Sequence, residues 1–234
     1  MAEDLKQIEV PTYICKRVNV DFPLDGVWNK WPWLQQATTQ PFRQFSGRGC
    51  VQRTYAKMCW NIKYFYVAFL CTDDDVWGSY RHHDEPIYEE DVVEVFIAPH
   101  GVAAGEPATY YEVEVSPHNV TFDVKVTNTT GTREAMQADR EWTCEGLRSA
   151  VQVKGTLDDL STKDDHWSCE IAIPWAALGI EHPPLHSEMP VNLYRIDRDR
   201  RQNRGGDEYQ GWSPTLTAQA DNHVPGRFGV VGFA

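Results

Sequence analysis

The sequence predicts an all-β fold, an antiparallel β-sandwich of about ten strands with one short helix. The first observation is that short runs rich in β-branched and aromatic residues recur along the chain, bounded by Gly, Pro, Asn and Asp. The second is that convincing helical periodicity is almost absent. The 234 residues contain no linker-like stretch, so we expect residues 1–234 to form a single domain.

Turn and loop signals separate the predicted strands. Asn61-Ile62-Lys63 is a connection of hairpin size between two apolar runs. Pro174 directly precedes the one expected helix, Trp175–Leu178, which fits the preference of proline for the start of a helix. Gly101–Thr109 and Arg198–Asp221 are rich in Gly, Pro and charged residues and are predicted to be loops. The predicted strands are Thr12–Val18, Thr54–Trp60, Tyr64–Cys71, Val92–Ala98, Tyr110–Ser116, Val120–Thr127, Arg148–Lys154, Trp167–Ile173, Val191–Asp197 and Arg227–Phe233.

Charge and hydropathy exclude two classes of partner. The formal net charge is -12, from 34 acidic and 22 basic residues, so nucleic acid would meet net repulsion. No apolar run reaches the roughly 18 residues that a membrane span requires. The N-terminus, MAEDLKQIEV, lacks the apolar centre of a secretory signal. We therefore expect no nucleic-acid or membrane partner, and a protein that is either cytoplasmic or, if a leader was removed, extracellular or periplasmic.

The six cysteines show neither a CxxC pair nor zinc-type spacing. Cys59, Cys71 and Cys169 fall within apolar strand patterns, which favours buried free thiols. A disulfide between Cys144 and Cys169 is the alternative, because the segments that carry them could be neighbours.

The strands between Val92 and Thr127 alternate apolar and charged residues, which predicts one core face and one polar face. Such a polar face would place carboxylates beside Arg195 of a later strand, and charged groups of this kind bind hydroxyls well. An ordinary solvated sheet face is the alternative. The predicted core face comprises Val93, Val95, Ile97, Tyr111, Val113, Val115, Phe122, Val124, Val126, Tyr194 and Ile196, and the predicted polar face comprises Glu94, Glu112, Glu114, Asp123, Lys125, Arg195 and Asp197.

An acidic, aromatic-rich segment leads into the first of these strands and carries Trp77, Tyr80 and Tyr88. Surplus aromatic side chains often lie at recognition surfaces, where a flat apolar face and a polar tip both contact the ligand. Beside a row of carboxylates, these rings predict a site for a small, polar, ring-shaped ligand such as a sugar.

A series of motifs follows in order along nearly the whole chain. They are Asp25-Gly26-x-Trp28, Tyr64–Phe69 followed by Asp73, Tyr88-Glu89-Glu90-Asp91-x-x-Glu94, a Trp167-to-Trp175 strand and helix, and the terminal Phe228-Gly229. In this order they resemble the family 9 carbohydrate-binding modules. The resemblance implies a β-sandwich that binds a carbohydrate ligand without hydrolysing it, often at the end of a glucan or xylan chain. It also implies bound calcium and fusion to, or association with, a carbohydrate-active enzyme.

The resemblance assigns roles to particular positions. Tyr88 stands where the family has the first of two rings that sandwich the sugar, and Glu94 stands at the family's binding glutamate. The second ring is replaced by Asn222 and His223, and Glu112 reverses the charge of a family arginine, which leaves the identity of the sugar open. Two further tryptophans in predicted loops are candidates for the missing ring. The full predicted ligand-binding set is Tyr88, Glu94, Glu112, Arg195, His223, Asn222, Trp77 and Trp212.

Asp73, Asp75 and Asp91 are the predicted metal ligands. Hard oxygen ligands at the start and end of a loop suit calcium, which would order the loop of about 18 residues between them. The resemblance supports a structural calcium ion. An acidic solvated turn is the alternative, as is a transition metal on His82-His83-Asp84-Glu85, although adjacent histidines bind one ion poorly without further ligands.

A glycoside-acting enzyme is one competing interpretation. Such an enzyme needs two carboxylates about 5 to 10 Å apart, and Glu94 with Glu112 or Glu170 is the candidate pair. The acids look distributed rather than paired, and no GxSxG nucleophile motif occurs, so we expect the chain not to be an enzyme.

A b-type haem electron-transfer domain is the other competing interpretation. Its axial ligands would come from Met58, His166 and His223. Met58 lies within a strand pattern and is better explained as a core residue.

Overall fold

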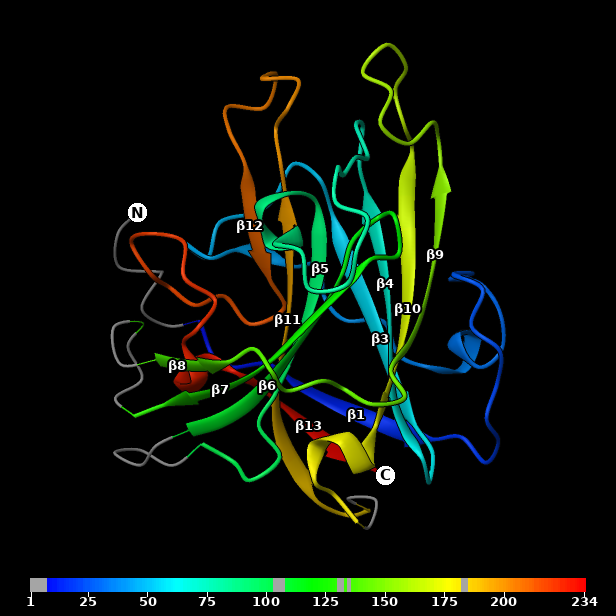
Figure 1. Ribbon diagram of the computed structural model, residues 1–234, viewed down its shortest axis with the longest axis vertical. Helices are drawn as coiled ribbons and strands as arrows, with labels where there is room; N and C mark the ends of the chain where they lie inside the picture. The colour runs from blue at the N-terminus through cyan, green and yellow to red at the C-terminus, as the bar shows by residue number, and fades with distance from the viewer. Residues whose placement is uncertain (1–7, 103–107, 130–132, 134–135, 182–184) are drawn as a thin grey trace.

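In the described residues, thirteen strands form one hydrogen-bonded sheet that curls on itself, so that its two halves pack face to face as a sandwich (Figure 1). The computed structural model describes residues 8–102, 108–129, 133, 136–181 and 185–234. The helices in these ranges are single 3-10 turns. None of them has the length and apolar character of a membrane span. The predicted all-β sandwich is confirmed, including the turn at Trp175–Leu178 (η5).

The strand order defines a first and a second layer, which share β1 (Thr12–Arg17). The first layer runs β8 (Met136–Asp139), β7 (Thr121–Asn128), β6 (Ala108–Val115), β5 (Val92–Ile97), β11 (Glu188–Asp197), β13 (Gly229–Phe233) and β1. The second layer runs β1, β3 (Thr54–Trp60), β4 (Tyr64–Thr72), β10 (His166–Pro174) and β9 (Arg148–Lys154). The remaining elements are β2 (Arg43–Gln44), β12 (Glu208–Gly211), η2 (Trp33–Gln35), η3 (Ile87–Glu89) and η6 (Pro225–Arg227).

The sheet is mixed rather than purely antiparallel. β1 runs parallel to both of its neighbours, pairing Thr12–Cys15 with Val230–Phe233 of β13, and Lys16 and Arg17 with the end of β3. Parallel pairs join segments that are distant in sequence, so no hairpin pattern in the sequence predicts them. β1 therefore closes the curl, because it hydrogen-bonds to both layers.

Strands β2, β8 and β12 were not predicted, and β12 lies inside the predicted loop Arg198–Asp221. They are two to four residues long, which is too short for alternation to be recognised. The cysteines are free thiols, as expected, so no bridge joins Cys144 and Cys169.

The core between the layers is built from β-branched and aromatic residues of alternating positions. Val95 and Leu193 of the first layer and Val67 and Ile171 of the second all belong to this one cluster and are fully buried. The predicted core residues of β5 and β6 lie here. The period-2 alternation of each strand therefore fixes which side chains remain for the outer face.

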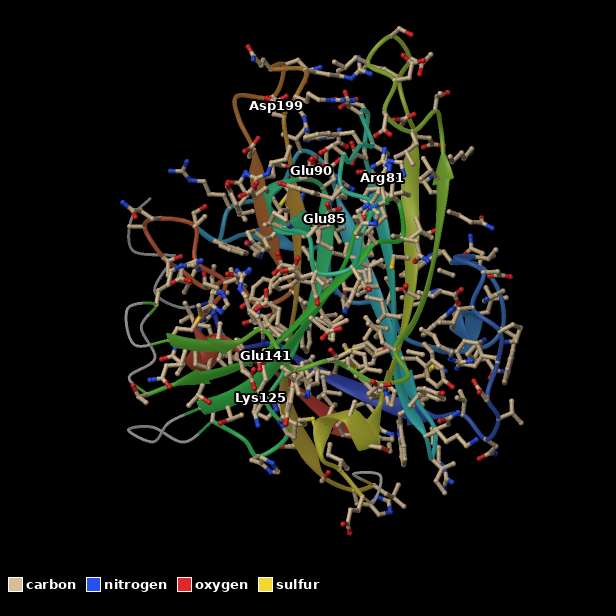
Figure 2. All side chains as sticks on the ribbon, viewed as in Figure 1. Arg81, Glu85, Glu90, Lys125, Glu141 and Asp199 are labelled. Atoms are coloured by element: carbon tan, nitrogen blue, oxygen red, sulfur yellow. The ribbon has the colours of Figure 1, made fainter. Side chains whose placement is uncertain are left out.

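The register corrects the predicted face of β7. Asp123 lies opposite Val113, and Val124 lies opposite Glu112, so Phe122, Val124 and Val126 share the outer face with Glu112. Asp123 accepts a hydrogen bond from the backbone N–H of Cys144, and Lys125, labelled in Figure 2, lies over the Tyr111 ring. Both residues lie opposite core positions of β6 and so belong to the inner side. A short turn from Ser116 to Val120 sets this register, and β7 carries apolar residues on the parity opposite to that of β6.

The register also corrects the predicted faces of β11. Arg195 lies opposite Val93 and Tyr194 opposite Glu94, so Arg195 points between the layers, whereas Tyr194 and Ile196 lie on the outer face. Arg195 was predicted on the same face as Glu94, and that prediction is wrong. The outer face of the first layer is thus partly apolar and is covered by loops.

Arg195 is fully buried and links the two layers through polar contacts. Its Nη2 lies 2.7 Å from Asp73 Oδ2 and 3.5 Å from Asp197 Oδ1, and its Nη1 donates to the backbone oxygen of Thr72 and to Thr54 Oγ1. Burial raises the pKa of Asp73 to about 6, against the opposing effect of Arg195. A buried charge network of this kind costs desolvation, so it stabilises the fold only while both signs are present.

We expect Arg195→Met to lower the free energy of unfolding by about 3–5 kcal/mol, because it leaves Asp73 buried without its paired cation, while Asp197 keeps only Arg204. Urea denaturation followed by tryptophan fluorescence measures the change. Arg53→Met is the matched control, since Arg53 is exposed and should change stability by less than about 0.5 kcal/mol. Equal stability of the two variants would contradict this account of Arg195.

Gly229 has no room for a side chain. A Cβ at this position would lie 2.3 Å from the Trp212 ring, whereas a Cβ at Gly226 would meet nothing within 4 Å. We expect Gly229→Ala to destabilise the protein by about 1–3 kcal/mol through overpacking, and Gly226→Ala to be close to neutral. Thermal unfolding of the two variants measures the difference, and a Gly229→Ala variant as stable as wild type would contradict the close packing of Trp212.

Candidate functional site

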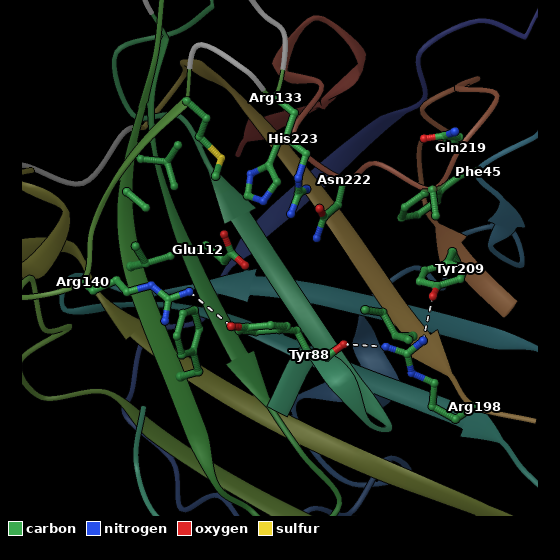
Figure 3. Close-up of a pocket in the computed structure, with 17 residues that line it drawn as sticks. Phe45, Tyr88, Glu112, Arg133, Arg140, Arg198, Tyr209, Gln219, Asn222 and His223 are labelled. Carbon is green, nitrogen blue, oxygen red and sulfur yellow. Dashed lines mark hydrogen bonds between the residues drawn. The ribbon is translucent and has the colours of Figure 1, made fainter. Parts of the chain in front are cut away.

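A pocket of about 470 Å³ opens on the outer face of the first layer (Figure 3). Strands β6, β7, β8 and β11 contribute its base, and the segments around Tyr88, Arg140, Arg198 and His223 form its walls. This volume is in the range that holds a small ligand. Its lining comprises Phe45, Tyr88, Glu112, Phe122, Val124, Val126, Arg133, Met136, Ala138, Arg140, Ile196, Arg198, Tyr209, Gln219, Ala220, Asn222 and His223.

Tyr88 stands at the centre of the lining and is held by two arginines (Figure 3). Arg140 donates to its hydroxyl at 3.2 Å, and Arg198 donates to its backbone oxygen at 2.9 Å. Its ring meets Phe122 edge to face, with centroids 5.4 Å apart. The half-buried ring therefore keeps a fixed orientation at the pocket.

A second tyrosine stands across the pocket from Arg140. Tyr209 of β12 accepts a hydrogen bond from Arg198 Nη1 at 2.6 Å, and the Arg198 guanidinium also pairs with Asp207 at 2.9 Å. Arg198 thus bridges the two tyrosines. The pocket presents aromatic rings and guanidinium N–H groups side by side.

Hydrogen bonds to two carboxylates fix the segment between Tyr88 and the start of β5. Glu90, labelled in Figure 2, is buried and accepts hydrogen bonds from the backbone and the hydroxyl of Ser79. Asp91 accepts backbone N–H groups from Trp77 and Arg198. Both carboxylates satisfy loop donors that have no strand partner.

Three glutamates lie together beneath the pocket. Glu94 of β5 lies directly opposite Glu114 of β6, and Glu112 is two residues along β6 on the same face. Oxygen atoms of the three lie within 4.8 Å of one another. Glu112 reaches the pocket, whereas Glu94 and Glu114 are fully buried below it.

Burial dominates the electrostatics of this cluster. It raises the pKa of Glu94 to about 8, with Glu112 adding to the shift and the hydrogen bond from Asn222 opposing it. Burial also raises the pKa of Glu114 well above its ordinary value, and the charges of Glu94 and Glu112 act in the same direction. A like-charged cluster in an apolar setting favours the uptake of protons or cations.

His223 packs in the aromatic wall behind the glutamates. Its ring lies 5.4 Å from that of Phe96, and its Nδ1 is 2.9 Å from the hydroxyl of Tyr110. Burial lowers the pKa of His223, so the ring is neutral near pH 7. Asn222 beside it donates from Nδ2 to Glu94 Oε2 at 2.7 Å.

Five of the eight predicted ligand-binding residues come together. Tyr88, Glu112, Asn222 and His223 line the pocket, and Glu94 lies directly below, bonded to Asn222. Their separation in sequence is bridged by the pairing of β5 with both β6 and β11.

Three of the predicted residues lie elsewhere. Trp77 lies under the Arg200 guanidinium, outside the pocket lining. Trp212 is buried in the core against Tyr13, and Arg195 points between the layers. The missing second ring is therefore supplied by neither tryptophan.

Sequence reasoning missed several residues of the pocket. Phe122 was placed on the wrong face of β7, and Tyr209 sits on a strand too short to be recognised. Arg140 follows β8, a segment with no clear pattern. The residues missed are Phe45, Phe122, Val124, Val126, Arg133, Met136, Ala138, Arg140, Ile196, Arg198, Tyr209, Gln219 and Ala220.

The predicted metal ligands do not assemble as a set. Asp73 and Asp91 meet Asp197 rather than Asp75, which is paired with Arg200 at 2.6 Å. Arg195 and Arg204 already supply positive charge to this aspartate cluster, defined as Asp73, Asp91 and Asp197. Both oxygens of Asp91 accept backbone N–H groups, so this donor set does not favour calcium at that place.

The competing interpretations also change. Glu170 lies on the second layer, where Trp33 and Lys30 donate to its carboxylate, so it shares no site with Glu94. Met58 packs in the core between the layers, whereas His223 lies on the outer face of the first, so these two do not flank a haem.

The fold and the pocket define a β-sandwich binding domain. A family model described as carbohydrate family 9 binding domain-like matches residues 20–233, and this chain belongs to that family. The resemblance found in the sequence is thereby confirmed.

Three solved structures share the fold. A candidate carbohydrate-binding protein of Bacteroides uniformis superposes with a TM-score of 0.74 at 14% identity, covering 97% of this chain and 100% of that one. A family 9 module of Caldicellulosiruptor kristjanssonii in complex with cellotriose gives 0.59 at 14% identity over 95% and 93% of the two chains. Its complex with glucose gives 0.58 at 15% identity over 94% and 95%.

An extracellular protein of Arthroderma benhamiae is 26% identical over 147 residues. The match covers 61% of this chain and 63% of that protein, so it spans less than two thirds of the relative.

Proposed function

We propose that this chain binds a mono- or oligosaccharide, or the end of a polysaccharide chain, in the pocket at Tyr88, without catalysing its hydrolysis. Family membership supports the class of ligand, as do the modules of the same fold in complex with cellotriose and glucose. The observation that carries the proposal for this site is the anchored Tyr88 ring, which faces Glu112 and Asn222 across a pocket of suitable size.

The chemistry of the lining suits a pyranose. The apolar C–H face of the sugar would stack on Tyr88, with Tyr209 as the second aromatic surface. Ring hydroxyls would donate to Glu112 and accept from Arg140 and Asn222, since charge-assisted hydrogen bonds are the stronger ones. Each aromatic face contributes about 1–2 kcal/mol, so affinity would be micromolar or weaker.

A hydrolytic role is less well supported. Two catalytic carboxylates must flank the scissile bond from different sides. Glu94 lies buried beneath Glu112 rather than across the pocket from it.

We further propose that the protein acts outside the cell, beside or fused to a carbohydrate-active enzyme. The extracellular relative supports the location. The net charge of -12 supports the absence of a nucleic-acid partner.

We expect Tyr88→Ala to weaken sugar binding by about 1–2 kcal/mol, or roughly 5- to 30-fold in Kd, because the stacking surface is lost. Titration calorimetry across glucose, cellobiose, xylobiose and longer oligosaccharides measures this. Tyr88→Phe keeps the ring and should retain most of the affinity. Tyr55→Ala, a half-buried tyrosine of β3 in the other layer, is the control. Binding that is unchanged in Tyr88→Ala would remove this pocket from the proposal.

We expect no release of reducing sugar when the purified protein is incubated with the oligosaccharide that binds most tightly. Release of reducing ends that disappears in Glu112→Gln would instead establish a hydrolase. Arg140→Gln, which alters the pocket wall but leaves all three glutamates, is the control for loss of binding alone.

A further inference from the structure

The glutamate cluster beneath the pocket, Glu94, Glu112 and Glu114, has unused ligand atoms. Neither carboxylate oxygen of Glu114 has a hydrogen-bond partner among the described residues, and the same holds for Glu94 Oε1. Both side chains are fully buried. Buried polar atoms without a partner are rare, because each forfeits its hydration. These oxygens are therefore available to a shared proton or to a bound cation.

Like groups face each other in this cluster. Oxygen atoms of Glu112 and Glu114 lie within 4.8 Å of each other, and two carboxylates have no donor between them unless a proton or a cation is shared. The surroundings are apolar and aromatic, with Phe96, Phe122 and Tyr194 on the same face, so the repulsion is weakly screened.

Within the part of the chain that the structure describes, no arginine forms an ion pair with the cluster, although Arg133, Arg140 and Arg198 lie near enough to oppose the rise in its pKa values. Arg133 pairs with Asp221, Arg198 pairs with Asp207, and Arg140 donates to the Tyr88 hydroxyl. The aspartate cluster between the layers is different, because Arg195 and Arg204 form ion pairs with it. Of the two buried carboxylate triads, the aspartate cluster forms ion pairs with arginine, whereas the described arginines near the glutamate cluster are paired with other groups.

We propose that Glu94, Glu112 and Glu114 form a divalent-cation site at the floor of the pocket, and that calcium is the ion it takes. Two oxygens bound to one calcium ion at about 2.4 Å can lie no more than about 4.8 Å apart. The three glutamates meet that limit, since their oxygens lie within 4.8 Å of one another. The donors are all carboxylate oxygens, without histidine or cysteine, which selects a hard cation.

The position of Glu112 gives the ion a second role. Glu112 is the member of the cluster that lines the pocket, so an ion bound to it is reached from the ligand side. Calcium takes six to eight oxygen ligands, and three carboxylates, one of which also accepts from Asn222, leave positions open. Adjacent hydroxyls of the bound sugar would fill them. This second part rests on the proposed function.

The test begins with calcium alone. The full chain is treated with EDTA, dialysed, and titrated with calcium chloride by calorimetry, with the melting temperature measured in parallel. We expect one ion to bind and the melting temperature to rise. Glu112→Gln and Glu114→Gln should each weaken calcium binding by about tenfold or more. Glu188→Gln, the same change at an exposed position, should leave it unaltered.

The Gln variants also report on folding. Removing one like charge from the cluster should leave the melting temperature in EDTA equal to or above that of wild type. A loss of calcium binding in a variant with an unchanged melting temperature is therefore a loss of ligand, not of fold. Absence of calcium binding to wild type would overturn the proposal. So would binding that Asp91→Asn abolishes and Glu112→Gln preserves, because the ion would then sit in the aspartate cluster.

Sugar titrations with calcium or with EDTA separate the two parts. A fall in sugar affinity of about tenfold or more in EDTA supports coordination of hydroxyls by the ion. Equal affinity in both buffers would overturn that part alone. Calcium binding lost in Glu112→Gln, with no binding of any sugar tested, would uphold the cation site while the proposed function failed.

Discussion

The central constraint on this molecule is that β5, β6 and β11 are buried on both faces. Successive side chains of a strand point to opposite sides, so one parity fills the core between the layers and the other must serve the outer face. Val95 and Val113 take the first role, and Glu94, Glu112 and Glu114 take the second. Because loops cover that outer face, the glutamates are enclosed rather than solvated. This enclosure distinguishes the three glutamates from those of an ordinary solvated strand face.

The molecule resolves buried charge in two different ways. Between the layers, Arg195 and Arg204 lie among Asp73, Asp91 and Asp197, so attraction offsets much of the desolvation cost. Beneath the pocket, the three glutamates have one amide donor, from Asn222, and no guanidinium partner among the described residues. The first arrangement joins two layers of the scaffold. The glutamate cluster faces a cavity, so protons or a bound ligand must neutralise its negative charge.

The sequence predicts the positions of the strands better than it predicts the face on which each side chain lies. The ten predicted strands recur with small shifts at their ends, because β-branched and aromatic runs bounded by turn residues depend only on local chemistry. The face of β7 was misassigned since parity was taken from apolar content alone. Phe122 and Val124 are apolar and yet lie beside Glu112, because the outer face is itself covered. When a strand is buried on both sides, the alternation of its residues does not show which side chains point into the core.

The predicted site residues divide into those placed by motif order and those placed by strand parity. Tyr88, Glu94, Glu112, Asn222 and His223 were found because motif order carries their positions, whatever their burial. Arg195 was misplaced because Tyr194 and Ile196 were assigned to the core, which left Arg195 for the polar face. In the structure Arg195 lies between the layers, where Asp73 and Asp197 are its partners. Long-range charge pairing has no local signature.

The loops, rather than the sheet, determine how specific the pocket can be. The sheet supplies a fixed floor, whereas Arg140, Arg198 and Tyr209 come from irregular or very short segments, and these tie the walls to Tyr88 through hydrogen bonds. Such contacts hold Tyr88 in one orientation before any ligand arrives, which lowers the entropy that binding must overcome. If the pocket binds the ligand proposed above, a change of ligand preference would require changes in the walls, while the carboxylates of β5 and β6 stay in register. Selectivity and stability are separated in this structure because different segments provide them.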